Sequence, residues 1–245
     1  MATQDRKAEL AGALAAVRER VGKACEAAGR SRDEVRLLAV TKTFPATDAA
    51  LLAGLGVTDL AENRDQEAAA KVAEVAGLRP DAAIRWHMVG RLQRNKARSV
   101  ARWADEVQSV DSPRLAEALA RAVHTARDAG ERDRPLDVLL QVSLDEDPAR
   151  GGCPVGELGA LAELVAQKSE ILHLRGLMAV APLGADPEPA FARLAAVFAR
   201  FRTDHPAATE LSAGMSGDLE QAIAHGSTCV RVGTALLGGR GLASP

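Results

Sequence analysis

Eight short apolar runs alternate with Ala- and Leu-rich stretches along almost the whole chain, and this alternation restricts the fold more than any other feature. The apolar runs have the length and composition of β-strands and occupy residues 35–41, 57–62, 84–90, 106–110, 136–144, 172–180, 209–214 and 229–234. The intervening stretches are long enough for helices and cover residues 46–55, 65–76, 93–103, 112–129, 154–169, 187–203 and 217–225. Such strand–helix alternation predicts a parallel sheet.

Eight strand–helix units in 245 residues predict an α/β protein with a single (β/α)8 TIM barrel. An open doubly wound sheet would have fewer strands and a G-x-G-x-x-G turn after the first, and that turn is absent. We expect one domain over residues 1–245, with an additional N-terminal helix in segment 1–30 and the barrel over 35–240. The breaker-rich segment 144–154 is expected to be an extended loop after the fifth strand.

Composition excludes several classes of function. A net charge of −2 and an aromatic content of 2% argue against nucleic-acid binding. Cys25, Cys153 and Cys229 lack C-x-x-C spacing, so neither a disulfide framework nor a metal site is expected. The N-terminus has no apolar signal core and no run is long enough to span a membrane, which predicts a cytoplasmic protein without a membrane partner.

Polar residues at the ends of the predicted strands are the candidate functional residues, because barrel chemistry collects at the carboxyl ends of the strands. They are Lys42, Glu62, Asn63, His87, with Gln93 and Asn95 just beyond it, Ser216, Arg231, Gly233 and Thr234. They include a lysine, a histidine and an arginine, but no carboxylate pair and no metal-ligand cluster.

Lys42 comes two residues after the apolar run Leu37–Val40. A lysine against an apolar wall has a lowered pKa, because burial disfavours the charged amine, and it becomes a nucleophile suited to Schiff-base chemistry. The alternative is a lysine whose stem packs while its ammonium group reaches solvent or pairs with Glu62.

The segment 210–240 offers turns where a phosphate can bind, since barrels often hold a phosphate by the loops after strands seven and eight. Ser216, Gly233 and Thr234 lie at these turns. Ser216 can instead be an ordinary helix N-cap and Gly233 an ordinary tight turn. A reactive lysine facing a phosphate site suggests an aldehyde that bears a phosphate, and pyridoxal 5'-phosphate (PLP) is the obvious candidate.

Five motifs in order over nearly the full chain resemble the YggS/PROSC family of pyridoxal phosphate homeostasis proteins. They are LLAVTK, AENRDQE, WHMVGRLQRNK, LRGLMAV and LSAGMSGDLEQAIAHGSTCVRVGTALLG. The resemblance implies a barrel similar to the N-terminal domain of fold-type III enzymes such as alanine racemase. It also implies that PLP is held as a Schiff base on Lys42.

By the same resemblance, Asn63 lies beside the cofactor, Arg231 faces its pyridine nitrogen and Met215 lines the pocket. The residues implied to hold the phosphate are Ser216, Gly233 and Thr234. His87 is placed near the ring by the barrel argument more than by the family. The chain departs from the family in one place, because the family often has GEN followed by a tyrosine and this chain has Ala-Glu-Asn-Arg at 61–64.

Arg231 bears on the function, because an arginine donates to the pyridine nitrogen, keeps it unprotonated and so weakens the ring as an electron sink. Arg231 can also be a strand-end residue in a salt bridge. The chain has no tyrosine to serve as the second acid–base group of a racemase, although His87 or a partner residue could substitute.

Three hypotheses for the function of this protein remain after these considerations. The leading one is intracellular PLP homeostasis, in which the protein buffers PLP or delivers it through transient contact with PLP-dependent apoenzymes. The second is a small PLP-dependent racemase or lyase, and the third is a barrel lyase in which Lys42 attacks a substrate carbonyl without PLP. The missing tyrosine favours a monomer. The basic segment after the third strand, RLQRNKARSVARWADE (91–106), is either a solvated helix face or a docking patch for an acidic partner.

Overall fold

A closed barrel of eight parallel strands forms the centre of the molecule. The computed structural model describes residues 2–145, 150–182 and 184–239. Its strands are β1 (Arg36–Val40), β2 (Asp59–Glu62), β3 (Arg85–Met88), β4 (Glu106–Val110), β5 (Leu136–Gln141), β6 (Leu172–Met178), β7 (Glu210–Ser212) and β8 (Cys229–Val232). Each strand pairs with its neighbour in the sequence, and β8 pairs with β1 to close the ring. The expectation of a (β/α)8 barrel is therefore confirmed.

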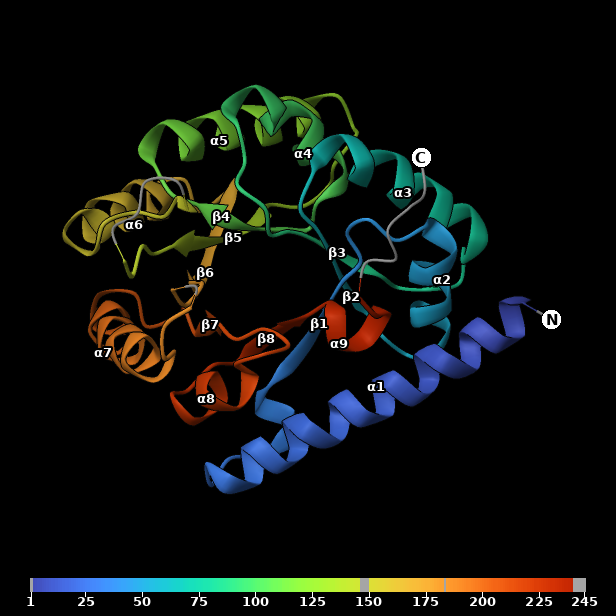
Figure 1. The fold of residues 1–245 in the computed structure, drawn as a ribbon. Coiled ribbons are helices and arrows are strands. Elements are labelled where there is room, and N and C mark those ends of the chain that lie inside the picture. Colours follow the sequence, from blue (N-terminus) through green and yellow to red (C-terminus); the bar gives the residue numbers. More distant parts are fainter. Residues whose placement is uncertain (1, 146–149, 183, 240–245) are drawn as a thin grey trace.

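Helices form an outer layer around the strands (Figure 1). They are α1 (Ala2–Ala27), α2 (Ala46–Gly54), α3 (Asp65–Leu78), α4 (Ala97–Trp103), α5 (Pro113–Asp128), α6 (Leu158–Ala166), α7 (Glu188–Asp204), α8 (Leu219–Ala224) and α9 (Thr234–Leu237). Short 3-10 helices, η1 (Arg32–Glu34), η2 (Arg94–Lys96) and η4 (Val155–Glu157), precede β1, α4 and α6. The sequence did not predict α9 or η1. Part of the loop expected at 144–154, and residue 240 at the end of the expected barrel region, lie outside the described residues.

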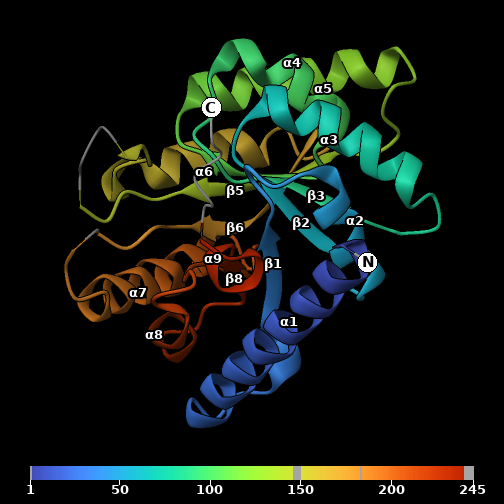
Figure 2. The ribbon, with the colours of Figure 1, turned by 45° about the vertical axis from the view of Figure 1, so that its right-hand side comes forward.

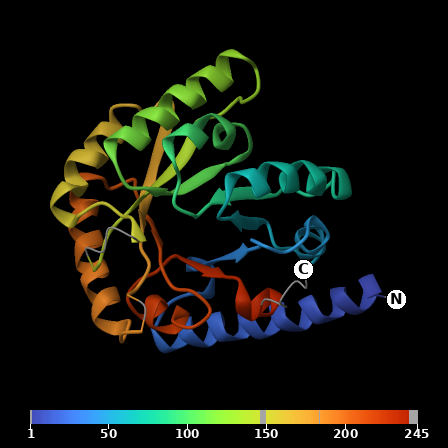
Figure 3. The ribbon, with the colours of Figure 1, turned by 45° about the horizontal axis from the view of Figure 1, so that its top comes forward.

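The predicted N-terminal helix is present as α1, which crosses the outside of the barrel past α8, α9 and α2 (Figures 1 and 3). Arg20 on α1 donates to the Ser216 backbone oxygen at 3.1 Å, and Arg6 donates to the Leu237 backbone oxygen at 3.1 Å. The helix therefore fastens the segments that follow β7 and β8. Within the described ranges, no helix is both long and apolar enough to cross a membrane.

Most of the apolar core lies between the outer faces of the strands and the helices, as alternation along a barrel strand requires. Residues such as Leu60, Trp86 and Val107 are buried there against the helices. The inward-facing positions carry only a small apolar cluster around Leu38 and Val40, together with many polar residues. Polar groups inside the barrel therefore lie at both the amino and the carboxyl ends of the strands.

Candidate functional site

A cavity of about 500 Å³ opens at the carboxyl ends of the strands. Its lining comes from β1, β2, β3, β6, β7 and β8 and the loops that follow them, so segments far apart in the sequence meet there, and the ends of β1 and β8 lie side by side (Figure 2). Every site residue predicted from the sequence except His87 lines this cavity: Lys42, Asn63, Met215, Ser216, Arg231, Gly233 and Thr234.

Lys42 stands in a turn two residues beyond the end of β1, and its side chain is exposed. The burial expected for its amine is therefore not found, although apolar residues such as Phe44 and Val180 line the same cavity. The next residue, Thr43, has a left-handed φ of 66°. Lys42 also does not pair with Glu62. That carboxylate is bound by the buried Lys71 at 2.6 Å, and Lys71 donates to the Thr41 backbone oxygen at 2.8 Å. The Lys71–Glu62 pair holds the turn that presents Lys42.

Arg231 lies below the cavity with only 5% of its surface exposed. Its guanidinium group donates to Ser212 Oγ at 2.8 Å and to the Ala179 backbone oxygen at 2.8 Å. Within the described chain it contacts no carboxylate, so the salt bridge considered for it is absent. Burial lowers the pKa of Arg231, yet an arginine stays protonated. The cavity floor is therefore a buried cation whose hydrogen-bond acceptors are neutral.

A chain of buried hydrogen bonds fixes this guanidinium from below. Ser212 Oγ donates to Gln108 Oε1 at 2.7 Å, and Gln108 Nε2 donates to Glu106 Oε1 at 2.7 Å. Ser212, Gln108 and Glu106 are all fully buried. The chain thus connects Arg231 at the mouth with the charged groups at the opposite end of the barrel.

His87 belongs to that opposite end and not to the cavity. Its Nδ1 lies 3.0 Å from Glu106 Oε1 and its Nε2 lies 2.9 Å from Asp59 Oδ1. In the register of the barrel it pairs with Glu106, the first residue of β4, which places it deep in the interior. The structure therefore corrects the expected position of His87 beside the ring, because its imidazole lies between the fully buried Glu106 and the partly buried Asp59.

The other side of the cavity offers small polar groups. Ser216 Oγ accepts from the Ala235 backbone nitrogen at 3.2 Å, which leaves the hydroxyl hydrogen free to donate into the cavity. Thr234 is exposed at the start of α9, beside Gly233. Asp218, whose charge would oppose a phosphate, is occupied by the Met215 backbone nitrogen at 2.6 Å and does not line the cavity.

Asn63 and Gly90 form the wall between β2 and β3. The Asn63 Oδ1 atom is buried without a hydrogen-bond partner. A buried acceptor of this kind destabilises the fold unless a ligand donates a hydrogen bond to it. Gly90 packs so closely that a Cβ there would lie 2.1 Å from the Asn63 backbone oxygen. Gly90 is therefore required as glycine to keep Asn63 at the cavity.

Sequence reasoning missed Lys71, Ser212 and Gln108, which support the site without lining it. Lys71 carried a signal, because it lies on the face of α3 that also buries Ala68 and Val75, where a charge needs a partner. Gln108 carried one as well, since it lies in the middle of the run Glu106–Val110, where a buried glutamine needs hydrogen-bond partners. Neither signal identifies the residue to which the buried side chain is hydrogen-bonded.

Comparison with known proteins identifies the family. The family model for the alanine racemase N-terminal domain matches residues 13–241. The pyridoxal phosphate homeostasis protein of Mycobacterium tuberculosis is 53% identical over 98% of this chain and 96% of its own length. The Escherichia coli protein of the same name is 38% identical over 95% of this chain and 97% of its own length.

Solved structures agree with this assignment. PipY of Synechococcus elongatus, determined with PLP bound, superposes with a TM-score of 0.78 at 36% identity, covering 94% of this chain and all of PipY. Alanine racemase from Corynebacterium glutamicum gives a TM-score of 0.66 at 14% identity over 95% of this chain and 62% of the enzyme, a likeness of fold alone. With its matching domain and relatives this similar over nearly their whole length, the chain belongs to the family of pyridoxal phosphate homeostasis proteins, built on the alanine racemase N-terminal domain.

Proposed function

We propose that this protein takes part in intracellular PLP homeostasis, holding PLP as a Schiff base on Lys42 and buffering it or delivering it to apoenzymes. The observation that carries the proposal is the meeting of Lys42, the buried Arg231 and the hydroxyl groups of Ser216 and Thr234 around one cavity. Its volume of about 500 Å³ is within the usual range for cofactor sites. The names of the relatives and the PLP bound to PipY support the same conclusion.

The polar groups of the cavity fit the chemistry of PLP. Ser216, Thr234 and the backbone at Gly233 offer donors for the phosphate, and Arg231 offers an N–H for the pyridine nitrogen. The Asn63 side chain, whose Oδ1 lacks a partner, lies beside the space for the ring. When bound, PLP supplies an aldehyde that condenses reversibly with the Lys42 amine and releases water.

The lining favours storage of the cofactor over catalysis. Arg231 keeps a proton that it cannot transfer, so a pyridine nitrogen facing it stays unprotonated and the ring is a weak electron sink. Among the described lining residues, Lys42 is the single acid–base side chain besides Arg231. A racemase needs a second such group opposite the lysine, and His87 lies too deep to provide it.

The exposure of Lys42 supports reversible loading. Its amine can be reached from solvent, so binding and release require no buried group to be uncovered first. A carrier needs such access, whereas an enzyme gains from excluding water around its intermediates. We further expect the loaded protein to be a monomer, which sedimentation can check.

The test is the near-visible absorption spectrum of wild type and Lys42→Ala with added PLP, followed by borohydride reduction and peptide mapping. We expect a yellow band in the wild type, none in Lys42→Ala, and the reduced adduct on Lys42. Lys23→Ala is the matched control, because Lys23 is exposed on α1 and far from the cavity lining.

No band in the wild type, or adducts on surface lysines alone, would refute the assignment of Lys42. Steady turnover of an amino acid by the wild type, lost in Lys42→Ala, would instead favour the racemase or lyase.

A further inference from the structure

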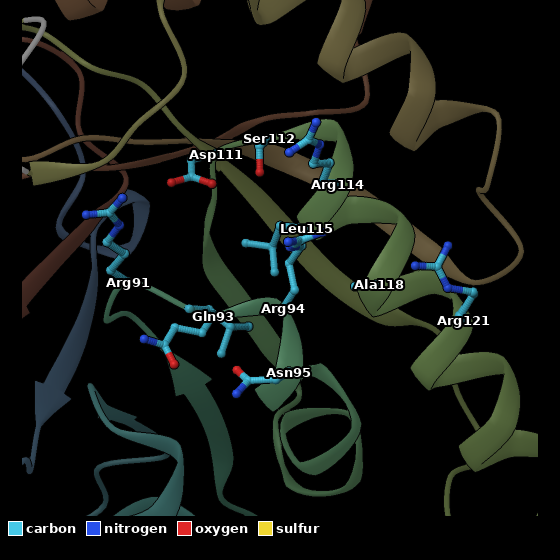
Figure 4. Close-up of a pocket in the computed structure, with 11 residues that line it drawn as sticks. Arg91, Gln93, Arg94, Asn95, Asp111, Ser112, Arg114, Leu115, Ala118 and Arg121 are labelled. Carbon is cyan, nitrogen blue, oxygen red and sulfur yellow. The ribbon is translucent and has the colours of Figure 1, made fainter. Parts of the chain in front are cut away.

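A second and larger cavity, of about 970 Å³, lies beside the first at the carboxyl ends of β3 and β4 (Figure 4). Its two walls are the segment from Arg91 to Asn95 and the first turns of α5, from Ser112 to Arg121. We call it the arginine groove. The groove is lined by the first five residues of the basic motif, 91–95, for which the sequence left two interpretations open.

Charge in the arginine groove is unbalanced. Four arginines line it, Arg91, Arg94, Arg114 and Arg121, against one carboxylate, Asp111. Within the described ranges, Arg91, Arg94 and Arg114 form no ion pair or side-chain hydrogen bond, and Arg121 reaches Glu117 only at 3.8 Å. By contrast, the neighbouring Arg102 on α4 binds Glu131 at 2.8 Å. The groove arginines are therefore free to bind an external anion.

The spacing of these arginines suits an extended ligand. Arg114 and Arg121 are seven residues apart on α5, about 10 Å along the helix axis. Arg91 lies across the groove from them (Figure 4). A single phosphate binds where donors converge on one point, whereas these guanidinium groups are spread along the walls. Carboxylates placed at intervals along a peptide would meet them in turn, each able to form paired hydrogen bonds with an arginine.

The floor and rim of the groove also fit a peptide. Leu115 is almost fully buried beneath the groove, while Leu92, at 7% exposed, and the half-buried Ala118 offer a small apolar surface. Gln93 and Asn95 are exposed, and their amide groups have no hydrogen-bond partner among the described residues. Such amides can pair with a peptide backbone.

The groove adjoins the mouth of the first cavity. Val89 and Gly90 line that cavity, and Arg91 and Leu92, the next residues, line the groove. A ligand in the groove would therefore lie beside the cavity that Lys42 lines. We propose that the arginine groove docks an acidic segment of a partner protein, with alternating acidic and apolar side chains. This docking depends on the groove alone and does not require bound cofactor.

The test measures binding of a fluorescein-labelled peptide of alternating glutamate and leucine, by anisotropy at low salt. We expect binding to the wild type that weakens about tenfold in Arg94→Glu/Arg114→Glu and weakens steadily as salt is added. A peptide with glutamine in place of glutamate should not bind. Arg98→Glu is the matched control, because Arg98 is exposed on α4 but does not line the groove, and we expect it to bind nearly as the wild type.

Three outcomes would overturn the proposal. They are no binding of the acidic peptide, equal loss in Arg98→Glu and Arg94→Glu/Arg114→Glu, and displacement of the peptide by low concentrations of inorganic phosphate or pyrophosphate, which would indicate a small-anion site. The PLP absorption band is recorded on the same samples and should be unchanged in the charge-reversal variant. Failure of docking and failure of cofactor binding are thus seen separately.

Discussion

The two ends of the barrel interior treat charge in opposite ways. At the amino end of the strands, Arg36 contacts Asp59 at 3.2 Å and Glu210 at 2.7 Å, and Glu106 is shared by Arg85 and His87. At the carboxyl end, Arg231 contacts only neutral oxygens, and Lys42 has no ion pair within the described chain. Cations whose charge the fold already balances are structural, whereas cations left unbalanced at the mouth remain available to a ligand.

The difference has an energetic meaning. A buried ion pair contributes little net stability, but removing one partner leaves a charge in a medium that solvates it poorly. Arg231 already bears part of that cost in the free protein. PLP, a phosphate ester whose pyridine nitrogen can accept a hydrogen bond, would offset this cost on binding. The unpaired Arg231 therefore lowers the stability of the free protein and favours binding of the ligand.

The largest expected effect is at the amino end, in Glu106→Ala. The substitution leaves His87, Arg85 and Arg36 short of a carboxylate, and we expect the free energy of unfolding to fall by about 3–5 kcal/mol. Urea denaturation measures it. Glu117→Ala removes an exposed glutamate on α5 and should cost less than about 1 kcal/mol. Equal losses in both variants would contradict the comparison between the two ends.

Arg231→Leu should affect stability less than Glu106→Ala does, and should mainly weaken PLP binding. We expect a smaller loss of unfolding free energy than in Glu106→Ala, because the buried charge leaves together with its desolvation cost. The dissociation constant for PLP, measured by titration of the absorption band, should rise about tenfold or more, since a hydrogen bond from a charged donor is lost.

Arg175→Leu is the matched control for Arg231→Leu, because Arg175 binds Glu210 at 3.3 Å at the amino end. It should leave the dissociation constant for PLP unchanged. Unaltered PLP affinity in Arg231→Leu would remove the role proposed for the buried guanidinium group.

The pH dependence of stability tests the charge balance at the amino end of the barrel through His87. Burial lowers the pKa of His87, but Glu106 and Asp59 outweigh it and raise the pKa above its usual 6.5. The stabilisation from protonated His87 is therefore complete below about pH 6.5 and is lost as pH rises through the raised pKa. The difference in unfolding free energy between wild type and His87→Gln should shrink over that range, by at most about 1.4 kcal/mol per pH unit. A difference that grows with pH would mean that burial dominates.

The change in unfolding free energy at acid pH depends on the protonation of Glu106. Burial raises the pKa of this carboxyl, but His87 and the arginines lower it further, to about 2. Its stabilisation is complete above its usual pKa of 4.5 and is lost as pH falls toward 2. Unfolding measured between pH 5 and 2, for wild type against Glu106→Gln, checks this sign.

The smallest expected effect concerns the link between the two ends. Gln108→Met keeps the volume of the side chain but removes the hydrogen bonds to Ser212 and Glu106, so Arg231 loses part of its support. We expect PLP affinity to fall by a few-fold, consistent with one indirect hydrogen bond. Gln141→Met, a buried glutamine on β5 outside the cavity lining, should have no effect on affinity. The reverse order would refute the positioning role of Gln108.

The sequence predicted the barrel and most of the candidate residues that line one cavity, because strand–helix alternation and strand ends are local features. The run 106–110 became β4 with the same bounds, and Lys42, Asn63 and Arg231 came together as expected. His87 was misplaced because its depth depends on the register between β3 and β4, which no local pattern encodes. Lys42 lies in a turn in which Thr43 has a left-handed φ, and a threonine does not predict that conformation.

The cavity proposed for the cofactor lies across the seam where β8 pairs with β1. Lys42 follows the first strand to leave the ribosome, whereas Arg231 and Gly233 come with the last strand. During synthesis the lysine is therefore made long before the groups proposed to hold the cofactor beside it. A growing chain has no complete site until its final strand closes the ring, so occupancy of the site would report that the barrel is finished.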